Sequence, residues 1–151
     1  MKLLVQRVRK AWVSVDGAEV GRIGAGALLL LGVARGDTEA DAHLLAGKAS
    51  RLRIFDDEEG RLNRDIGAVD GAFLAVSQFT LYGDCRKGNR PSYIEAAEPE
   101  EGRRLYSRFV EALGALGHRV ETGEFQAHMV VGLENDGPVT LMLESRGRVH
   151  P

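Results

Sequence analysis

The alternation of apolar and polar residues predicts strands at the start of the chain. Residues 3–8 have the composition of a strand with no fully apolar face, and residues 11–15 alternate clearly. Asp16-Gly17 comes next, and Asp-Gly between two such runs indicates a two-residue hairpin turn, because both central positions take positive φ. We expect the returning strand at 18–23. The run 27–33 is apolar on both sides, which predicts a strand covered on both faces.

Two later segments have the period of an amphipathic helix. The first opens at Asp37 or Thr38, both of which suit a helix N-cap. In the second, Pro99 takes a first helical position and Gly117 follows the last turn. Apolar residues recur every three or four positions in both segments: Ala42, Leu45, Ala49 and Leu52, then Leu105, Phe109, Leu113 and Leu116. Each segment is therefore expected to pack one face on a sheet.

The rest of the chain predicts short strands and one long loop. Residues 82–97 have no clear period, so we expect an ordered loop there, and a turn signal at 134–138 separates the last two strands. The remaining strands are expected at 53–55, 61–63, 72–76, 119–121, 127–133 and 139–143. Together these elements predict an α+β fold, with a mainly antiparallel sheet and two flanking helices.

Length and composition narrow the class of protein. At 151 residues, with 44% hydrophobic and 28% charged residues, the chain has the make-up of one ordered domain spanning 1–151. The longest apolar stretch, 25–34, is about half a membrane span, and the N-terminus turns polar too early for a signal peptide. We therefore expect a cytoplasmic protein with no membrane partner. A net charge of -2 argues against wrapping long nucleic acid, yet the basic segment 86–90 makes a non-catalytic RNA- or DNA-binding module a rival hypothesis.

Two polar clusters could carry chemistry. Ser77-Gln78-Phe79-Thr80 stands at the end of an apolar strand, where its polar groups either cap a turn or converge with backbone N–H groups on a substrate oxygen. The second cluster is Asn135-Asp136-Gly137-Pro138-Val139-Thr140. Its Gly-Pro pair is either an ordinary turn sequence or a cis peptide bond that fixes a tight backbone conformation. The residues alone leave both choices open.

The histidines and the single cysteine are weaker candidates. We expect solvated or capping roles for His43, His118 and His150, while His128 opens a strand near the second cluster. A Cys85/His128 nucleophile pair would make a cysteine hydrolase or amidase, but Cys85 has no such signature around it, so a spare thiol is the preferred interpretation. One cysteine also excludes an internal disulfide framework. No spacing of histidine and acidic residues fits a metal site.

At the two clusters the chain resembles the D-aminoacyl-tRNA deacylases, also called D-tyrosyl-tRNA deacylases. The Ser-Gln-x-Thr-Leu signature of that family is similar to Ser77-Gln78-Phe79-Thr80-Leu81, and its Asn-x-Gly-Pro-x-Thr signature is similar to 135–140. Val5-Gln6-Arg7-Val8 and the loop 88–92 also look like the family, so the resemblance extends over nearly the whole chain. Two motifs in the right order, about the right distance apart, make it specific.

The resemblance implies a β-barrel-like sheet with flanking helices and a homodimer whose active sites lie at the interface, where a cis Gly-Pro bond enters the partner's pocket. It implies hydrolysis of the ester between a D-amino acid and the 3′-terminal adenosine of tRNA, as proofreading in translation. Glycyl-tRNA, including glycine mischarged on tRNA(Ala), is also an expected substrate. The expected partners are tRNA and a second copy of the chain, not DNA, and no metal or organic cofactor is expected. Given the low net charge, tRNA contact is expected at a basic strip of Arg86, Lys87 and Arg90.

The same resemblance implies the site residues. Ser77, Gln78 and Thr80 are expected to be catalytic. Substrate-binding roles are expected for Phe79, Gly137, Pro138, Arg7, Phe125 and Met129. A rigid Gly-Pro backbone can exclude an L-amino acid at its Cα whatever the side chain, whereas a side-chain pocket selects for size. Two roles are open for Thr80: a nucleophile, or a hydrogen-bonding group beside a water that the 2′-OH of the tRNA positions. No adjacent base supports the first.

Overall fold

One long strand organises the sheet. The computed structural model, which describes residues 1–146, joins the predicted strands 3–8 and 11–15 into β1 (Lys2–Val15). The strand β8 (Met129–Glu144) pairs antiparallel with β1 from the Val15–Met129 pair to the Lys2–Glu144 pair, with an interruption at residues 136–139. Because one partner spans both predicted runs, the backbone of β1 stays extended between them.

The other edge of β1 is shared by two shorter strands. The strand β2 (Ala18–Ile23) pairs with the second half of β1 through the Asp16-Gly17 turn, whose φ values of 50° and 78° confirm the predicted hairpin. The strand β3 (Gly26–Gly32) pairs with the first half of β1 and is buried along nearly its whole length. The doubly covered strand predicted at 27–33 is thus confirmed.

Two parallel pairings complete the sheet. The strand β6 (Ala72–Ser77) runs parallel to β3, and β7 (Val120–Thr122) runs parallel to β6, which gives the order β2-β1-β3-β6-β7 with β8 on the opposite edge of β1. Each parallel pair is joined by a connection that contains a helix, as parallel strands require. The predicted fold class, α+β with a barrel-like sheet and two flanking helices, is confirmed, and the sheet is mixed in its strand directions.

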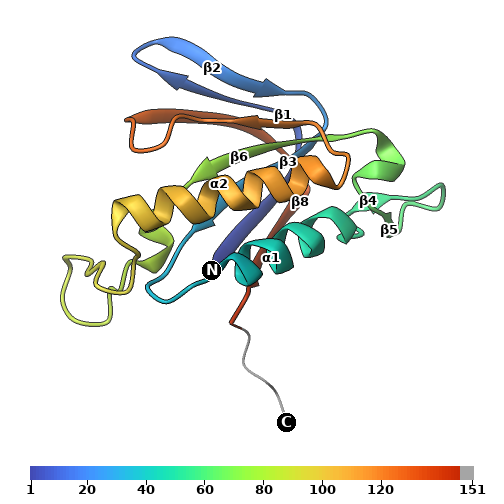
Figure 1. Ribbon diagram of the computed structural model, residues 1–151. Coiled ribbons are helices and arrows are strands. Elements are labelled where there is room, and N and C mark those ends of the chain that lie inside the picture. Colours follow the sequence, from blue (N-terminus) through green and yellow to red (C-terminus); the bar gives the residue numbers. More distant parts are fainter. Residues whose placement is uncertain (147–151) are drawn as a thin grey trace.

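Both helices lie on one face of the sheet (Figure 1). The helix α1 (Glu39–Arg51) begins after its N-cap Thr38, whose N–H and hydroxyl donate to Asp41 Oδ2 at 2.7 and 2.9 Å. The helix α2 (Pro99–Ala115) begins with proline at its first position, as predicted. Leu116 follows the end of α2 and is exposed, so its predicted place in the apolar stripe is wrong.

The core lies between the helices and the sheet. It contains the largest cluster of buried side chains, among them Leu29, Leu31, Leu45, Phe73, Leu105 and Phe109. Within residues 1–146, neither helix has the length and apolar character needed to cross a bilayer. The packing of α2 over the end of β6 is the feature that shapes the candidate site.

The remaining segments are short and ordered. The strands β4 (Phe55–Asp56) and β5 (Leu62–Arg64), near the strands predicted at 53–55 and 61–63, form a second hairpin. The 3-10 helices η1 (Gly67–Val69) and η2 (Phe79–Tyr82) flank β6. In the long loop, Asp84 and Ser92 exchange backbone hydrogen bonds of 2.8 and 2.9 Å, so the expectation of an ordered loop is confirmed. His150 lies outside the described residues.

Candidate functional site

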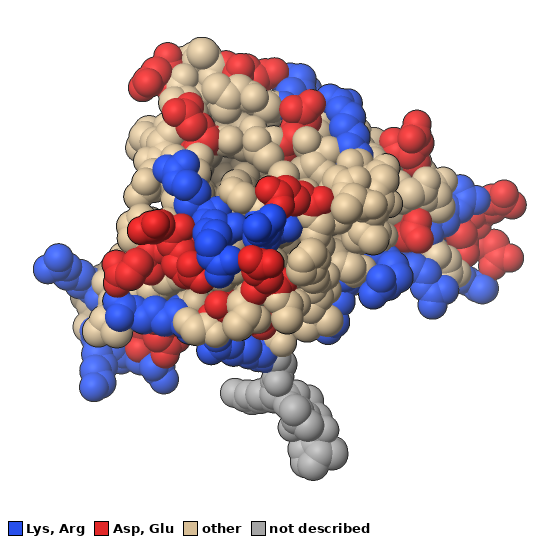
Figure 2. Space-filling view, in the orientation of Figure 1, with Lys and Arg blue, Asp and Glu red and all other residues tan. Residues whose placement is uncertain are grey.

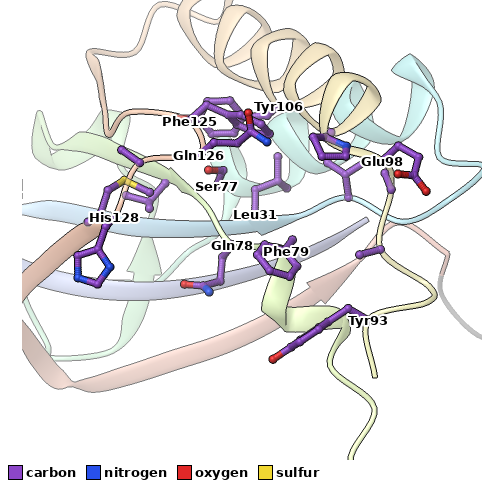
Figure 3. A pocket seen from close by; sticks show the side chains of 18 of the residues that line it. Leu31, Ser77, Gln78, Phe79, Tyr93, Glu98, Tyr106, Phe125, Gln126 and His128 are labelled. Atoms are coloured by element: carbon purple, nitrogen blue, oxygen red, sulfur yellow. The ribbon is translucent and has the colours of Figure 1, made fainter. Parts of the chain in front are cut away.

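The first polar cluster opens into a cleft of about 720 Å³ between the end of β6 and the start of α2. Ser77 is the last residue of β6, Gln78 precedes η2, and Phe79 begins it. The Gln78 N–H donates to the Leu31 carbonyl at 2.8 Å, so β3 holds the cluster in register up to the cleft. Figure 3 shows Ser77 beneath the side chains of Phe125 and Tyr106, with Gln78 and Phe79 on the side of Ser77 away from those two rings.

Thr80 lies beside the cleft lining, with its side chain exposed. The amide nitrogen Nε2 of Gln78 donates to the Thr80 hydroxyl. An amide N–H is a donor and accepts no proton, so this contact orients the hydroxyl without activating it. The N–H groups of Phe79 and Thr80, at the start of η2, have no acceptor within that helix.

Aromatic side chains form the walls of the cleft. Tyr106 on α2 packs against Phe125 with ring centroids 5.8 Å apart, and Phe79 meets Tyr93 edge-on at 5.1 Å. Met129, the first residue of β8, also lines the cleft. Of the predicted site residues, the structure thus brings together Ser77, Gln78, Phe79, Phe125 and Met129.

Tyr106 is a lining residue that sequence reasoning missed. Its hydroxyl donates to the Ala75 carbonyl at 2.8 Å, and burial raises the pKa of Tyr106 to about 12. In the sequence it lies beside Leu105 of an apolar helical stripe, and a tyrosine there is as consistent with a packing role in the core as with a role in a functional site. Tyr93 was missed because it lies in the loop without a period, where only its aromatic character marks it.

Within residues 1–146, Cys85 and the histidines do not share one site. His128 lines the cleft of the first cluster, whereas its position in the chain predicted proximity to the second. Cys85 is exposed on the loop between Asp84 and Ser92. His118 Nε2 lies 2.5 Å from Ser50 Oγ, and His43 is exposed on α1. Among residues 1–146 no group of three or more His, Cys, Asp or Glu side chains could hold a metal ion.

The second cluster forms an excursion within β8. The predicted turn at 134–138 does not reverse the chain, because β8 pairs with β1 on both sides of it. Gln6 pairs with Thr140 and Val8 with Asn135, so Arg7 alone faces residues 136–139. The peptide bond between Gly137 and Pro138 is cis, as the resemblance implied. Both residues are exposed, which leaves the excursion projecting from the sheet.

Arg7 anchors this excursion from beneath. Its guanidinium is almost fully buried and donates to the Ile54 carbonyl at 2.8 Å and to the Asp136 carbonyl at 3.1 Å. Carboxylate oxygens of Asp56 and Asp136 each lie 3.4 Å from it. Arg7 is therefore a structural support for the Gly137 segment in this chain.

The two motifs do not meet within the described chain. The cleft is lined from β3, β6, α2 and the start of β8, whereas the Gly137-Pro138 segment lies on β8 against Arg7. A β-carbon built at Gly137 would have Arg7 Nη2 and Val139 Cγ2 as its nearest neighbours, both at 3.0 Å. Within one copy of the described chain, the Gly137 segment therefore does not line the cleft.

A basic strip lies on the loop after η2. Figure 2 shows Lys and Arg side chains together at the left end of the molecule, where Figure 1 places this loop, while the two signs alternate over the helices. Arg86 forms a two-point pair with Asp84, at 2.8 and 2.7 Å, which lowers the pKa of Asp84 to about 2. The predicted strip is therefore partly neutralised by its own aspartate.

Comparisons with known proteins agree with the two motifs. The family described as D-Tyr-tRNA(Tyr) deacylase matches residues 4–144. A "D-aminoacyl-tRNA deacylase" from Heliobacterium modesticaldum is 56% identical over 147 residues, covering 97% of this chain and 98% of the relative. One from Symbiobacterium thermophilum is 57% identical over 145 residues, covering 96% of each. These matches confirm the resemblance and its class of enzyme.

Solved structures share the fold. One described as "c-Myc DNA Unwinding Element Binding Protein" superposes with a TM-score of 0.91 at 38% identity, covering 97% of this chain and all of that one. Another, described as a probable eukaryotic D-amino acid tRNA deacylase, has a TM-score of 0.79 at 20% identity, with coverage of 95% and 98%. The second likeness concerns the fold alone.

Proposed function

Because the chain belongs to the D-Tyr-tRNA(Tyr) deacylase family, we propose that it hydrolyses the ester joining a D-amino acid to the 3′-terminal adenosine of tRNA. The observation that carries this proposal is the position of the first family motif. Ser77, Gln78 and Phe79 line the described cleft, whose walls are otherwise mainly apolar and aromatic. Such a cleft can hold a nucleoside and its ester while a few polar groups orient the reaction.

In this proposal, backbone N–H groups at the start of η2 stabilise the transition state of ester hydrolysis. The N–H groups of Phe79 and Thr80 lack intrahelical acceptors, and they can stabilise the negative charge that develops on the ester carbonyl oxygen. Water attacks the carbonyl carbon of the ester, the bond from that carbon to the ribose oxygen breaks, and the ribose oxygen takes the proton that the water loses. The 2′-OH of the tRNA positions the water, while Gln78 and Thr80 hold a hydrogen-bonded edge of the cleft.

The Gly137-Pro138 segment serves as the chiral filter. Gly137 has a φ of 119° and no side chain, so its backbone can approach the substrate Cα closely. A rigid backbone at that point excludes the Cβ of an L-amino acid and admits any D side chain. Glycine lacks a Cβ and passes the filter, so glycyl-tRNA, including glycine mischarged on tRNA(Ala), is also a substrate.

A homodimer brings the two motifs together. The strand β8 pairs with β1 and with no other described strand, and it exposes Val130, Leu141 and Met142. An unpaired edge with apolar side chains favours contact with another chain. In such a dimer the Gly137 segment of one subunit reaches the cleft of the other. We propose that this activity proofreads translation, and we therefore expect the enzyme in the cytoplasm.

DNA binding is the second candidate. It is favoured by the DNA-binding name of one structural relative and by the basic loop, and opposed by the net charge of -2. We expect no DNA partner, so single-stranded or duplex DNA should not compete with tRNA for the protein. Tight DNA binding at physiological salt, together with no ester hydrolysis, would support this candidate and contradict ours.

The deciding assay incubates the purified protein with D-Tyr-tRNA and L-Tyr-tRNA in parallel and follows loss of the aminoacyl label. We expect rapid loss of D-tyrosine and a rate for L-tyrosine close to that of the uncatalysed ester. Cys85→Ala serves as a control, because it should leave both rates unchanged, whereas a cysteine hydrolase would lose its activity. Equal hydrolysis of both esters would refute the proposed selectivity.

A further inference from the structure

We propose that Asn135 and Thr140 are positioning residues that fix the Gly137-Pro138 segment and so determine how strictly D- and L-substrates are distinguished. The inference rests on the proposed function of that segment as a chiral filter. The observation behind it is a set of side-chain hydrogen bonds that closes the excursion at its base. Neither residue needs to touch the substrate to have this effect.

The excursion needs closing because its strand pairing is interrupted. One residue of β1, Arg7, faces residues 136–139 of β8, so the regular ladder of backbone hydrogen bonds stops on both sides. Gly137 is exposed and carries no side chain that could hold it in place. A projecting segment of this kind keeps one conformation only if other groups replace the missing ladder.

Asn135 supplies that replacement. Its Nδ2 donates to the Arg7 carbonyl at 2.9 Å and to the Val139 carbonyl at 3.1 Å. The first bond ties β8 to β1 just before the excursion, and the second joins Asn135 to Val139 across its base. A single amide thus satisfies two carbonyls that the interrupted ladder would otherwise leave unpaired.

Thr140 fixes the orientation of that amide. Its hydroxyl donates to Asn135 Oδ1 at 3.2 Å and accepts from Gln6 Nε2, also at 3.2 Å. With Oδ1 held as an acceptor, Nδ2 must face the two carbonyls. The chain Gln6–Thr140–Asn135 therefore acts as one network, in which each group has its donor or acceptor role assigned by its neighbour.

The network is distinct from the Arg7 support. The Arg7 side chain contacts the carbonyl of Asp136 from the direction of Ile54, while Asn135 closes the base from within β8. The guanidinium holds the segment at Asp136, and the Asn135 amide joins that end of the segment to Val139. Weakening the amide network should therefore loosen the Gly137-Pro138 segment while the buried guanidinium still holds Asp136.

Isosteric variants test this inference. Asn135→Asp turns the two donors into acceptors that face carbonyls, and Thr140→Val removes the hydroxyl at constant shape. We expect the ratio of D-Tyr-tRNA to L-Tyr-tRNA hydrolysis to fall by about tenfold in Asn135→Asp, the size expected for one or two lost hydrogen bonds, and by less in Thr140→Val. Thr140→Ser keeps the hydroxyl and should retain the wild-type ratio of D-Tyr-tRNA to L-Tyr-tRNA hydrolysis. Asn63→Asp is the matched control, since the Asn63 amide bonds to Asp57 on the exposed β4–β5 hairpin.

A readout independent of activity separates this inference from the proposed function. By NMR, the Gly137 amide should be rigid on the ps–ns timescale in the wild type and in Asn63→Asp, and more mobile in Asn135→Asp. If the wild type hydrolyses neither ester, the proposed function fails, and the NMR result still decides the role of the network. Folded Asn135→Asp and Thr140→Val proteins with an unchanged ratio and a rigid Gly137 would overturn the inference.

Discussion

At the scale of single residues, the contact between Gln78 and Thr80 determines what the Thr80 hydroxyl can do. The hydroxyl accepts from an amide, which orients it and leaves it without a base. We predict that Thr80→Ala retains substantial activity on D-Tyr-tRNA, with a rate loss of about threefold to tenfold, the size of one hydrogen bond. Initial rates of deacylation measure this directly, with Thr80→Ser as the conservative control.

The tRNA provides the complementary half of that test. A D-Tyr-tRNA ending in 2′-deoxyadenosine lacks the hydroxyl that is proposed to position water, so it should be a poor substrate for the wild type. Mass spectrometry of a rapidly quenched reaction should find no acylated enzyme. A covalent tyrosyl adduct on Thr80 would show that threonine is the nucleophile and that this account of the chemistry is wrong.

Tyr106 offers a prediction about stability and pH. Its buried hydroxyl donates to Ala75, and its pKa is raised to about 12 from the usual value near 10. Tyr106→Phe should lower the free energy of unfolding by about 1 kcal/mol below pH 10. Above pH 10 the unfolded wild type ionises first, so the advantage of tyrosine should shrink as the pH rises toward 12. Urea unfolding of both proteins across this range tests the sign, and a constant difference up to pH 12 would contradict it.

At the scale of elements, the excursion in β8 depends on a glycine. Gly137 has a φ of 119°, and a β-carbon there would lie 3.0 Å from Arg7 Nη2 and from Val139 Cγ2. We predict that Gly137→Ala costs about 1–3 kcal/mol of stability and lowers the rate on D-Tyr-tRNA by about 10- to 100-fold, because the filter is displaced. Thermal unfolding and initial rates measure the two effects.

Gly60 is a control that separates the effect of a positive φ from the effect of crowding by neighbouring atoms. Gly60 also has a positive φ, 75°, but a β-carbon there would meet open space. Gly60→Ala should therefore cost stability through its backbone alone and leave the deacylation rate unchanged. If Gly137→Ala keeps the wild-type rate, the segment is not part of the filter.

Much of the element structure follows from local sequence. The apolar run 27–33, the Asp16-Gly17 turn and the period of α2 each specify one element through nearby residues, and all three are found. The continuity of β1 and β8 could not be predicted in this way. It arises because each strand holds the other extended across a polar or irregular stretch, an effect between residues far apart in the chain.

The motif residues of the candidate site could be predicted from the sequence, whereas several of the other residues that line the cleft could not. The Ser77-Gln78-Phe79-Thr80 cluster identifies the end of β6, and the resemblance assigned Phe125 and Met129, which line the same cleft. Tyr106 and Tyr93 reach that cleft from a helix stripe and from a loop, where nothing local distinguishes them from packing residues. The separation of the Gly137 segment from the cleft depends on the whole sheet and appears only in the structure.

At the scale of the whole molecule, charge limits how tRNA can be bound. With a net charge of -2, and with Arg86 already paired to Asp84, contact should involve two or three phosphates near Lys87 and Arg90. We predict a slope of about -2 for log affinity against log salt concentration, and a shallower slope for Lys87→Ala/Arg90→Ala. Binding isotherms at several salt concentrations measure it, and a slope near that of eight contacts would contradict a contact confined to the acceptor end.

In the proposed dimer, two motifs that lie apart in one chain complete one site across the interface. Phe79→Pro removes an N–H at the start of η2, where proline suits the helix, and should cost about 10²–10³ in rate. Phe79→Ala retains that N–H and is the control for loss of the ring. Gly137→Ala damages the filter. The two defects lie on different parts of the site, so they can be placed on different subunits.

Mixed dimers of Phe79→Pro and Gly137→Ala subunits, separated by different affinity tags, give the most direct measurement. In a site shared across the interface, one of the two sites in each mixed dimer receives both defects and the other receives neither. We predict that the mixed dimer recovers about half of the wild-type rate on D-Tyr-tRNA, with wild-type rejection of L-Tyr-tRNA. A mixed dimer no more active than the two parent variants would show that each site is built within one chain, and would contradict the account.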